Sequence, residues 1–179
     1  NHEYWLEASE YDELMSGLTG AGAVILDDQV VEISRGDAKF RLVGLDDKSL
    51  ADGTLEALLS DESIRHDQAG QKEETADNEN SGEKTLTVVL AHEPQHLARY
   101  AGTGVDLVLS GHAHGGQFRL PFVGGIVAPD QGFLPEYTAG EYYMNGTEMI
   151  VSRGLGNSVI PVRLFNYPEI VCVELVGKH

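Results

Sequence analysis

The spacing of apolar residues along the chain predicts both helices and strands. Over residues 7–18, apolar side chains recur every three or four positions, as they do on one face of an amphipathic helix (Ala8, Tyr11, Leu14, Met15 and Leu18). Continuous aliphatic runs at 85–91 and 105–109 predict two strands buried on both faces. Because the segment 96–100 between them predicts a short helix, we expect a βαβ unit with parallel strands.

Shorter runs around this unit predict further elements. A hairpin is expected from strands at 23–26 and 30–34, followed by a strand at 39–45 and a helix at 50–59. The C-terminal third predicts five more strands, at 124–127, 141–144, 148–152, 162–165 and 170–176. The expected fold class is therefore α/β, and Cys172, which lies in the last apolar run, is expected to be buried and inert.

Residues 61–84 interrupt this pattern. They contain eight acidic and three basic residues, and Ile64 is their one branched aliphatic residue. Such a segment cannot bury enough apolar surface to offset the entropy lost on ordering. We predict an acidic, flexible insertion within a single domain.

The composition excludes several classes of partner. The 12 basic and 29 acidic residues give a net charge of −17, which argues against nucleic acid or an anionic membrane held by a basic surface. No run approaches the roughly eighteen apolar residues that a membrane span requires. The single cysteine excludes an internal disulfide.

Both predicted buried strands are followed by histidines. His92 follows the first strand, and His112 and His114 follow the second within Ser110-Gly111-His112-Ala113-His114. Ligands of open α/β sheets gather at the carboxyl ends of such strands. If the second segment is extended, its two imidazoles point the same way, and neutral imidazole is the commonest metal ligand. A metal site is one interpretation, and a surface turn is the other.

Other side chains allow two interpretations, one functional and one structural. Arg153 and Arg163 could neutralise a second phosphate or a lipid headgroup, although structural ion pairs are the favoured reading. Four apolar side chains after the histidines form either a wall for a lipid-like substrate or ordinary core, namely Phe118, Leu120, Phe122 and Phe133. His66 and His179 are expected to lie away from any site, and His96 to face solvent.

Three segments in chain order resemble motifs of the calcineurin-like metallophosphoesterase superfamily. They are Asn1-His2-Glu3, Ala91-His92-Glu93-Pro94 and Gly111-His112-Ala113-His114. Segments 151–158, 161–163 and 168–170 resemble its bacterial phosphodiesterase branch. The resemblance implies that residues 1–179 are the C-terminal portion of a single metallophosphoesterase domain, within a four-layer αββα sandwich that has mixed sheets.

The resemblance also implies an activity and a role for each motif residue. The full-length enzyme would hydrolyse phosphoesters, particularly phosphodiesters of small or lipid-like molecules, with a hydroxide activated by two divalent ions (Mn, Zn or Fe). Asn1, His92 and His112 would bind one metal ion and His114 the other. His2 would be the catalytic histidine, oriented by Glu3.

The motifs that would complete the two-metal site are absent from this sequence. The family's Asp-x-His and Gly-Asp-x-x-Asp segments would precede Asn1, so we expect the isolated chain to hold at most one ion weakly and to be nearly inactive. That missing segment would also decide between a cytoplasmic and a membrane-associated bacterial protein. Two alternatives stay open: a non-catalytic binding module with a partial metal site, and a site completed by a separate polypeptide.

Overall fold

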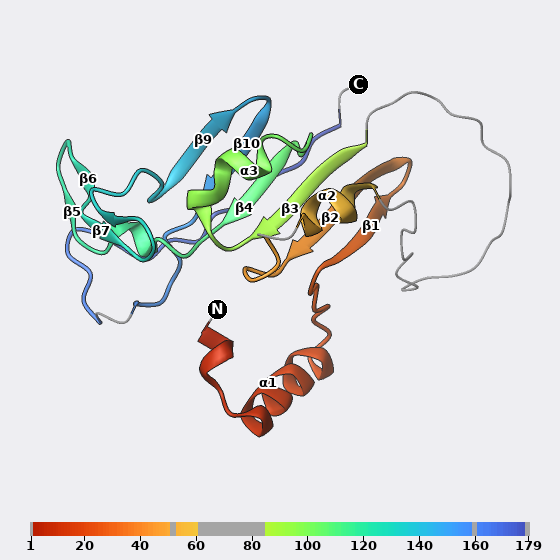
Figure 1. The fold of residues 1–179 in the computed structure, drawn as a ribbon, viewed down its shortest axis with the longest axis horizontal. Coiled ribbons are helices and arrows are strands. Elements are labelled where there is room, and N and C mark those ends of the chain that lie inside the picture. The colour runs from red at the N-terminus through yellow and green to blue at the C-terminus, as the bar shows by residue number, and fades with distance from the viewer. Residues whose placement is uncertain (1, 51–52, 61–84, 159–160, 178–179) are drawn as a thin grey trace, which may run out of the picture.

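A mixed six-stranded sheet forms the centre of the described structure (Figure 1). The computed structural model describes residues 2–50, 53–60, 85–158 and 161–177. The strand order is β1-β2-β3-β4-β10-β9, in which the four inner strands are parallel and each edge strand is antiparallel to its neighbour. The strands are β1 (Gln29–Arg35), β2 (Ala38–Leu45), β3 (Leu86–Ala91), β4 (Leu107–Ser110), β9 (Gly140–Met144) and β10 (Thr147–Val151). The predicted α/β class is confirmed.

The core lies between the inner strands and two short helices. Helices α2 (Thr54–Ser60) and α3 (Leu97–Tyr100) pack on the sheet through Leu55, Leu97 and Tyr100. All three side chains are at most 2% exposed, and one residue on each inner strand is fully buried (Val43, Val89, Val108 and Met149). Removal of this apolar surface from water is the main term that holds the sheet and helices together.

The predicted βαβ unit is confirmed, and it brings the two histidine segments together. Strand β3 continues through η3 (Pro94–His96) and α3 into β4, which pairs in parallel with β3. Beyond the paired residues, the Gly111 amide donates a hydrogen bond to the His92 carbonyl at 3.1 Å. The chain segments that follow the two strands therefore start side by side.

The N-terminal region contains the predicted helix, but its apolar face is uncovered. Helix α1 (Ala8–Gly20) lies away from the sheet in Figure 1, and none of its residues is buried. The predicted strand at 23–26 is wrong. The hairpin is instead formed by β1 and β2, because the chain reverses at Gly36 (φ +60°) and Asp37.

Two of the five strands predicted in the C-terminal third do not form among the described residues. The runs at 141–144 and 148–152 correspond to β9 and β10, but neither 162–165 nor 170–176 forms a strand among the described residues. Phe118 and Leu164 make one isolated bridge. Cys172 is a free and exposed thiol, so its predicted burial is wrong, because no described strand pairs with its segment.

Small hairpins follow the histidines. Strand β5 (Arg119–Leu120) pairs with β6 (Gly124–Gly125), and β7 (Val127–Ala128) pairs with β8 (Gly132–Phe133). The proposed insertion at 61–84 lies outside the described residues. Within the described part of the chain, no helix has the length and apolar character needed to cross a bilayer.

Candidate metal centre

Three of the predicted ligands lie beyond the carboxyl ends of β3 and β4. His92 follows β3, and His112 and His114 follow β4. The rings of His92 and His112 meet edge to face, with centroids 5.0 Å apart and planes at 73°. His112 is buried (7% exposed), whereas His92 as a whole residue is exposed. Two imidazoles from separate strands therefore share one small region at the sheet edge.

The loop that carries His112 and His114 is a tight left-handed turn and not the extended segment expected from the sequence. His112 (φ +60°), His114 (φ +47°) and Gln117 (φ +49°) all have positive φ, as do Gly115 and Gly116. The last part forms η4 (His114–Gly116). Non-glycine residues in this conformation cost about 1–3 kcal/mol each and cluster at functional sites. Two of the three non-glycine residues with positive φ in this loop are predicted ligands.

Asn166, which the sequence analysis missed, fixes this loop from the C-terminal segment. It is 3% exposed, and its amide nitrogen donates to the carbonyls of His114 at 2.7 Å and Gln117 at 3.2 Å. A side chain on Gly115 would collide with the Asn166 amide. The two residues are 51 positions apart in the sequence, and no local pattern connects them.

The surroundings keep two imidazoles neutral. Burial lowers the pKa of His92 to about 4, and the charge of His112 acts in the same direction. Burial also lowers the pKa of His114, although a hydrogen bond with the Gly156 backbone opposes this shift. A neutral ring presents a lone pair, which a metal ligand requires. The lowered pKa values of His92 and His114 therefore favour the ligand form of both rings.

Carboxylates that the sequence analysis did not select lie beside His112. Its Nε2 is 2.7 Å from Asp130 Oδ2, and ligand atoms of Glu93, His112 and Asp130 all lie within 4.8 Å of one another. Glu93 also acts on a further carboxylate, that of Asp47. Burial raises the pKa of Asp47, and the negative charge of Glu93 raises this pKa further. Asp130 lies in the turn between β7 and β8 with φ +56°, and its sequence context gives no metal-ligand signal.

The predicted catalytic pair belongs to η1 (His2–Trp5). The His2 ring stacks on Trp5 with centroids 5.2 Å apart, and both side chains are exposed. A hydrogen bond with its own backbone lowers the pKa of Glu3, and the charge of His2 contributes to the same shift. Asn1 lies outside the described residues.

His96 does not simply face solvent as expected. The residue is half-buried, and its Nε2 lies 3.0 Å from Glu93 Oε2. The two residues are three positions apart, at the start and end of the turn that contains η3. His96 therefore holds the Glu93 carboxylate instead of facing water alone. His66 and His179 lie outside the described residues.

Two interpretations were left open by the sequence, one for the two arginines and one for the apolar residues after the histidines, and the structure gives them different outcomes. Arg153 Nε lies 3.3 Å from Glu169 Oε2, which is the favoured ion pair, and Arg163 Nη2 donates to the Arg153 carbonyl at 2.8 Å. Most of the apolar residues after the histidines do not form core, although Phe118 is half-buried. Three of them are exposed by 47%, 109% and 74%: Leu120, Phe122 and Phe133.

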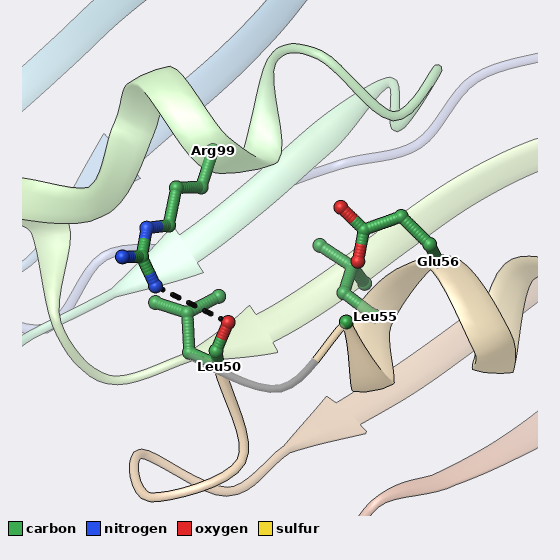
Figure 2. A pocket seen from close by; sticks show the side chains of 5 residues that line it. Leu50, Leu55, Glu56 and Arg99 are labelled. Carbon is green, nitrogen blue, oxygen red and sulfur yellow. Dashed lines mark hydrogen bonds between the residues drawn. The ribbon is translucent and has the colours of Figure 1, made fainter.

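A pocket of about 330 Å³ lies elsewhere, between α2 and α3 (Figure 2). Figure 2 shows Arg99 reaching from α3 toward Leu50, and its Nη1 donates to the Leu50 carbonyl at 3.3 Å. The residues that line the pocket are Leu50, Gly53, Leu55, Glu56 and Arg99. Because none of the predicted site residues is among these, the pocket is separate from the histidine cluster.

Sequence comparisons relate this chain to bacterial metallophosphoesterases. It is 34% identical to the uncharacterized metallophosphoesterase YkuE of Bacillus subtilis over 163 residues, which is 90% of this chain and 50% of the relative. It is 40% identical to a metallophosphoesterase of Aquifex aeolicus over 53% of this chain and 34% of the relative. It is 38% identical to the phosphodiesterase YaeI of Escherichia coli over 50% of this chain and 32% of the relative.

The chain spans about half the length of the first of these curated relatives and about a third of the length of the other two. No protein-family profile matches the chain, and no solved structure matches it. The curated relatives bear out the resemblance read from the motifs, and the similarity covers their C-terminal portion.

Proposed function

From its similarity to the C-terminal portion of bacterial metallophosphoesterases, we propose that this chain supplies the histidine-rich part of a phosphoester hydrolase. The observation that carries the proposal is the meeting of His92 and His112 beyond the ends of adjacent parallel strands, with His114 on the same loop. The relative named as a phosphodiesterase favours diesters over monoesters. We propose a small or lipid-like phosphodiester as the substrate class.

In this proposal the histidines and Asn1 hold divalent metal. The structure supports the donor set because burial lowers the pKa of His92 and His114, which favours the neutral ring, and because His112 lies within a group of possible ligands. When bound, divalent cations supply concentrated positive charge and a nucleophilic water at neutral pH. We assign Asn1, His92 and His112 to one ion and His114 to the other.

The protein's own residues would position the substrate and move a proton. His2 is exposed and lies against Trp5, so its ring can reach a substrate that approaches from solvent. We assign His2 as the general acid that protonates the leaving oxygen, with Glu3 orienting the ring. The left-handed loop, held by Asn166, fixes the direction of the His112 and His114 side chains.

The charge of the protein is compatible with an anionic substrate. With 29 acidic and 12 basic residues, its net charge of −17 repels anions at long range. Substrate recognition must therefore be local, at a point where bound cations reverse the sign of the potential. The proposal accordingly requires metal for substrate binding as well as for chemistry.

The test is hydrolysis of bis-p-nitrophenyl phosphate by the full-length protein with Mn²⁺. We expect release of nitrophenolate, loss of at least about 100-fold in kcat/KM on His112→Ala, and little change on the control His66→Ala. Equal turnover by the His112→Ala variant and the unaltered protein would reject the proposal.

We further propose that the 179-residue chain has at most weak activity by itself. Under the family pattern, a preceding segment with Asp-x-His and Gly-Asp-x-x-Asp would supply the carboxylate shared by two ions. The same assay on the purified chain separates this account from a self-sufficient enzyme. A non-catalytic module predicts no turnover from the full-length protein either.

A further inference from the structure

Two carboxylates beside His112 lie outside the ligand set that the sequence motifs imply. We propose that Glu93 and Asp130, together with His112, bind one divalent cation through two carboxylates and one imidazole. The inference rests on the proposed function, because it specifies how the ion at His112 is held. It adds ligands from two parts of the chain that the motifs leave without a role.

The geometry brings the three side chains together from three separate segments. Glu93 follows β3, His112 follows β4, and Asp130 lies in the turn between β7 and β8. One ligand atom from each residue lies within 4.8 Å of the other two. Two ligand atoms that bind one ion at about 2.0–2.2 Å lie at most about 4.4 Å apart, slightly closer than the upper limit of this group. Only small adjustments would be needed to enclose a cation.

Other contacts hold the Glu93 carboxylate and the turn that carries Asp130. His96 Nε2 lies 3.0 Å from Glu93 Oε2 and so fixes the orientation of the Glu93 side chain. The turn with Asp130 is braced by Gln131, whose side-chain amide bonds the Tyr137 backbone at 2.8 and 2.9 Å. Partners of this kind, which orient the ligands themselves, are typical of metal sites.

The site is buried on one side and open on the other. The His112 side chain is 5% exposed, whereas that of Asp130 is 64% exposed. Protein therefore surrounds the imidazole ligand while a cation or substrate can enter past Asp130. Two oxygen donors and one nitrogen donor suit Mn²⁺, Zn²⁺ or Fe²⁺ better than they suit Ca²⁺.

A structural ion pair between His112 and Asp130 is the competing reading, and metal titration separates the two. Mn²⁺ is titrated into the purified chain, and free Mn²⁺ is followed by its electron paramagnetic resonance signal. We expect one bound ion, with affinity lowered at least about tenfold by Glu93→Gln and by Asp130→Asn. Asp37→Asn, which removes an exposed carboxylate in the β1–β2 turn, is the charge-matched control and should change affinity less than about twofold.

The coordination sphere gives a second readout. Electron spin-echo modulation of the bound Mn²⁺ should show nitrogen coupling from imidazole that weakens in His112→Ala, where His92 is the remaining imidazole assigned to this ion. If both carboxylate variants bind Mn²⁺ as tightly as the unaltered chain while His112→Ala does not, this inference is overturned and the proposed function stands. If the unaltered chain binds no Mn²⁺, the inference is also overturned, and the phosphodiesterase assay alone decides the proposed function.

Discussion

His112 has the largest share of the structural signals at this site. Its side chain is buried and its backbone has a left-handed conformation. Its ring contacts both the His92 ring and the Asp130 carboxylate. The sequence predicted the histidines because imidazoles after buried strands have a recognisable spacing. It could not predict Asp130 or Asn166, because tertiary folding brings them to the loop from 18 and 54 residues away.

The titration of His92 predicts a pH dependence of stability. Because burial lowers the pKa of folded His92 from 6.5 to about 4, the unfolded chain binds a proton there more readily. The resulting stability is present above pH 6.5 and is lost as pH falls toward 4. Urea unfolding at several pH values should show a smaller loss over this range for His92→Asn. Identical pH profiles for the two proteins would contradict the assignment.

Gly116 should not tolerate a side chain. Its φ is +74°, and a Cβ there would collide with the Gly125 backbone and lie 3.2 Å from Thr138 Cγ2. We expect Gly116→Ala to lower the free energy of unfolding by about 1–2 kcal/mol from backbone strain plus about 1–3 kcal/mol from overpacking.

Gly124→Ala is the matched control for strain without a collision. Gly124 has φ +90°, and a Cβ there would have no atom within 4 Å. Denaturant unfolding of both variants should show a larger loss for Gly116→Ala. Equal losses would mean that the close approach of the two backbones is absent.

At the scale of elements, continuous apolar runs were the most informative part of the sequence. The run at 85–91 corresponds to β3 (Leu86–Ala91), and its predicted parallel partner is β4. Hydrophobic pattern failed where pairing is decided at a distance. The run at 170–176 reads as a strand, yet in the described structure no neighbouring strand supplies hydrogen-bond partners.

The central position of β10 predicts a strong effect of shortening Met149. Its side chain is 0% exposed within a strand that pairs on both sides, so Met149→Ala should lower the free energy of unfolding by about 2–5 kcal/mol. Tyr143→Ala, on edge strand β9 at 70% exposure, should cost less than about 1 kcal/mol. Thermal or urea unfolding measures both, and similar losses would contradict the assigned strand order.

At the scale of the whole molecule, the described chain leaves much apolar surface uncovered. Exposure reaches 74% at Trp5, 80% at Tyr167, 82% at Ile170 and 78% at Val176. Uncovered apolar side chains of this size promote association between molecules. The α/β class could be predicted from sequence, but the coverage of its surfaces could not, because exposure depends on everything that packs against the chain.

This surface predicts self-association of the purified chain. Sedimentation velocity should detect concentration-dependent association at tens of micromolar, and the double variant Ile170→Lys with Val176→Lys should shift the chain toward monomer. Glu174→Lys changes charge in the same segment without removing an apolar side chain, and it should have a smaller effect. A chain that stays monomeric at every concentration would contradict the prediction.

The central claim is that His92, His112 and His114 meet around divalent metal, and paramagnetic NMR tests it most directly. Sub-stoichiometric Mn²⁺ added to the chain should broaden the ring proton signals of these three histidines together, and His112→Ala should weaken the broadening at the other two. No broadening at the three histidines, or broadening at His92 and His114 that is unchanged in His112→Ala, would contradict the claim.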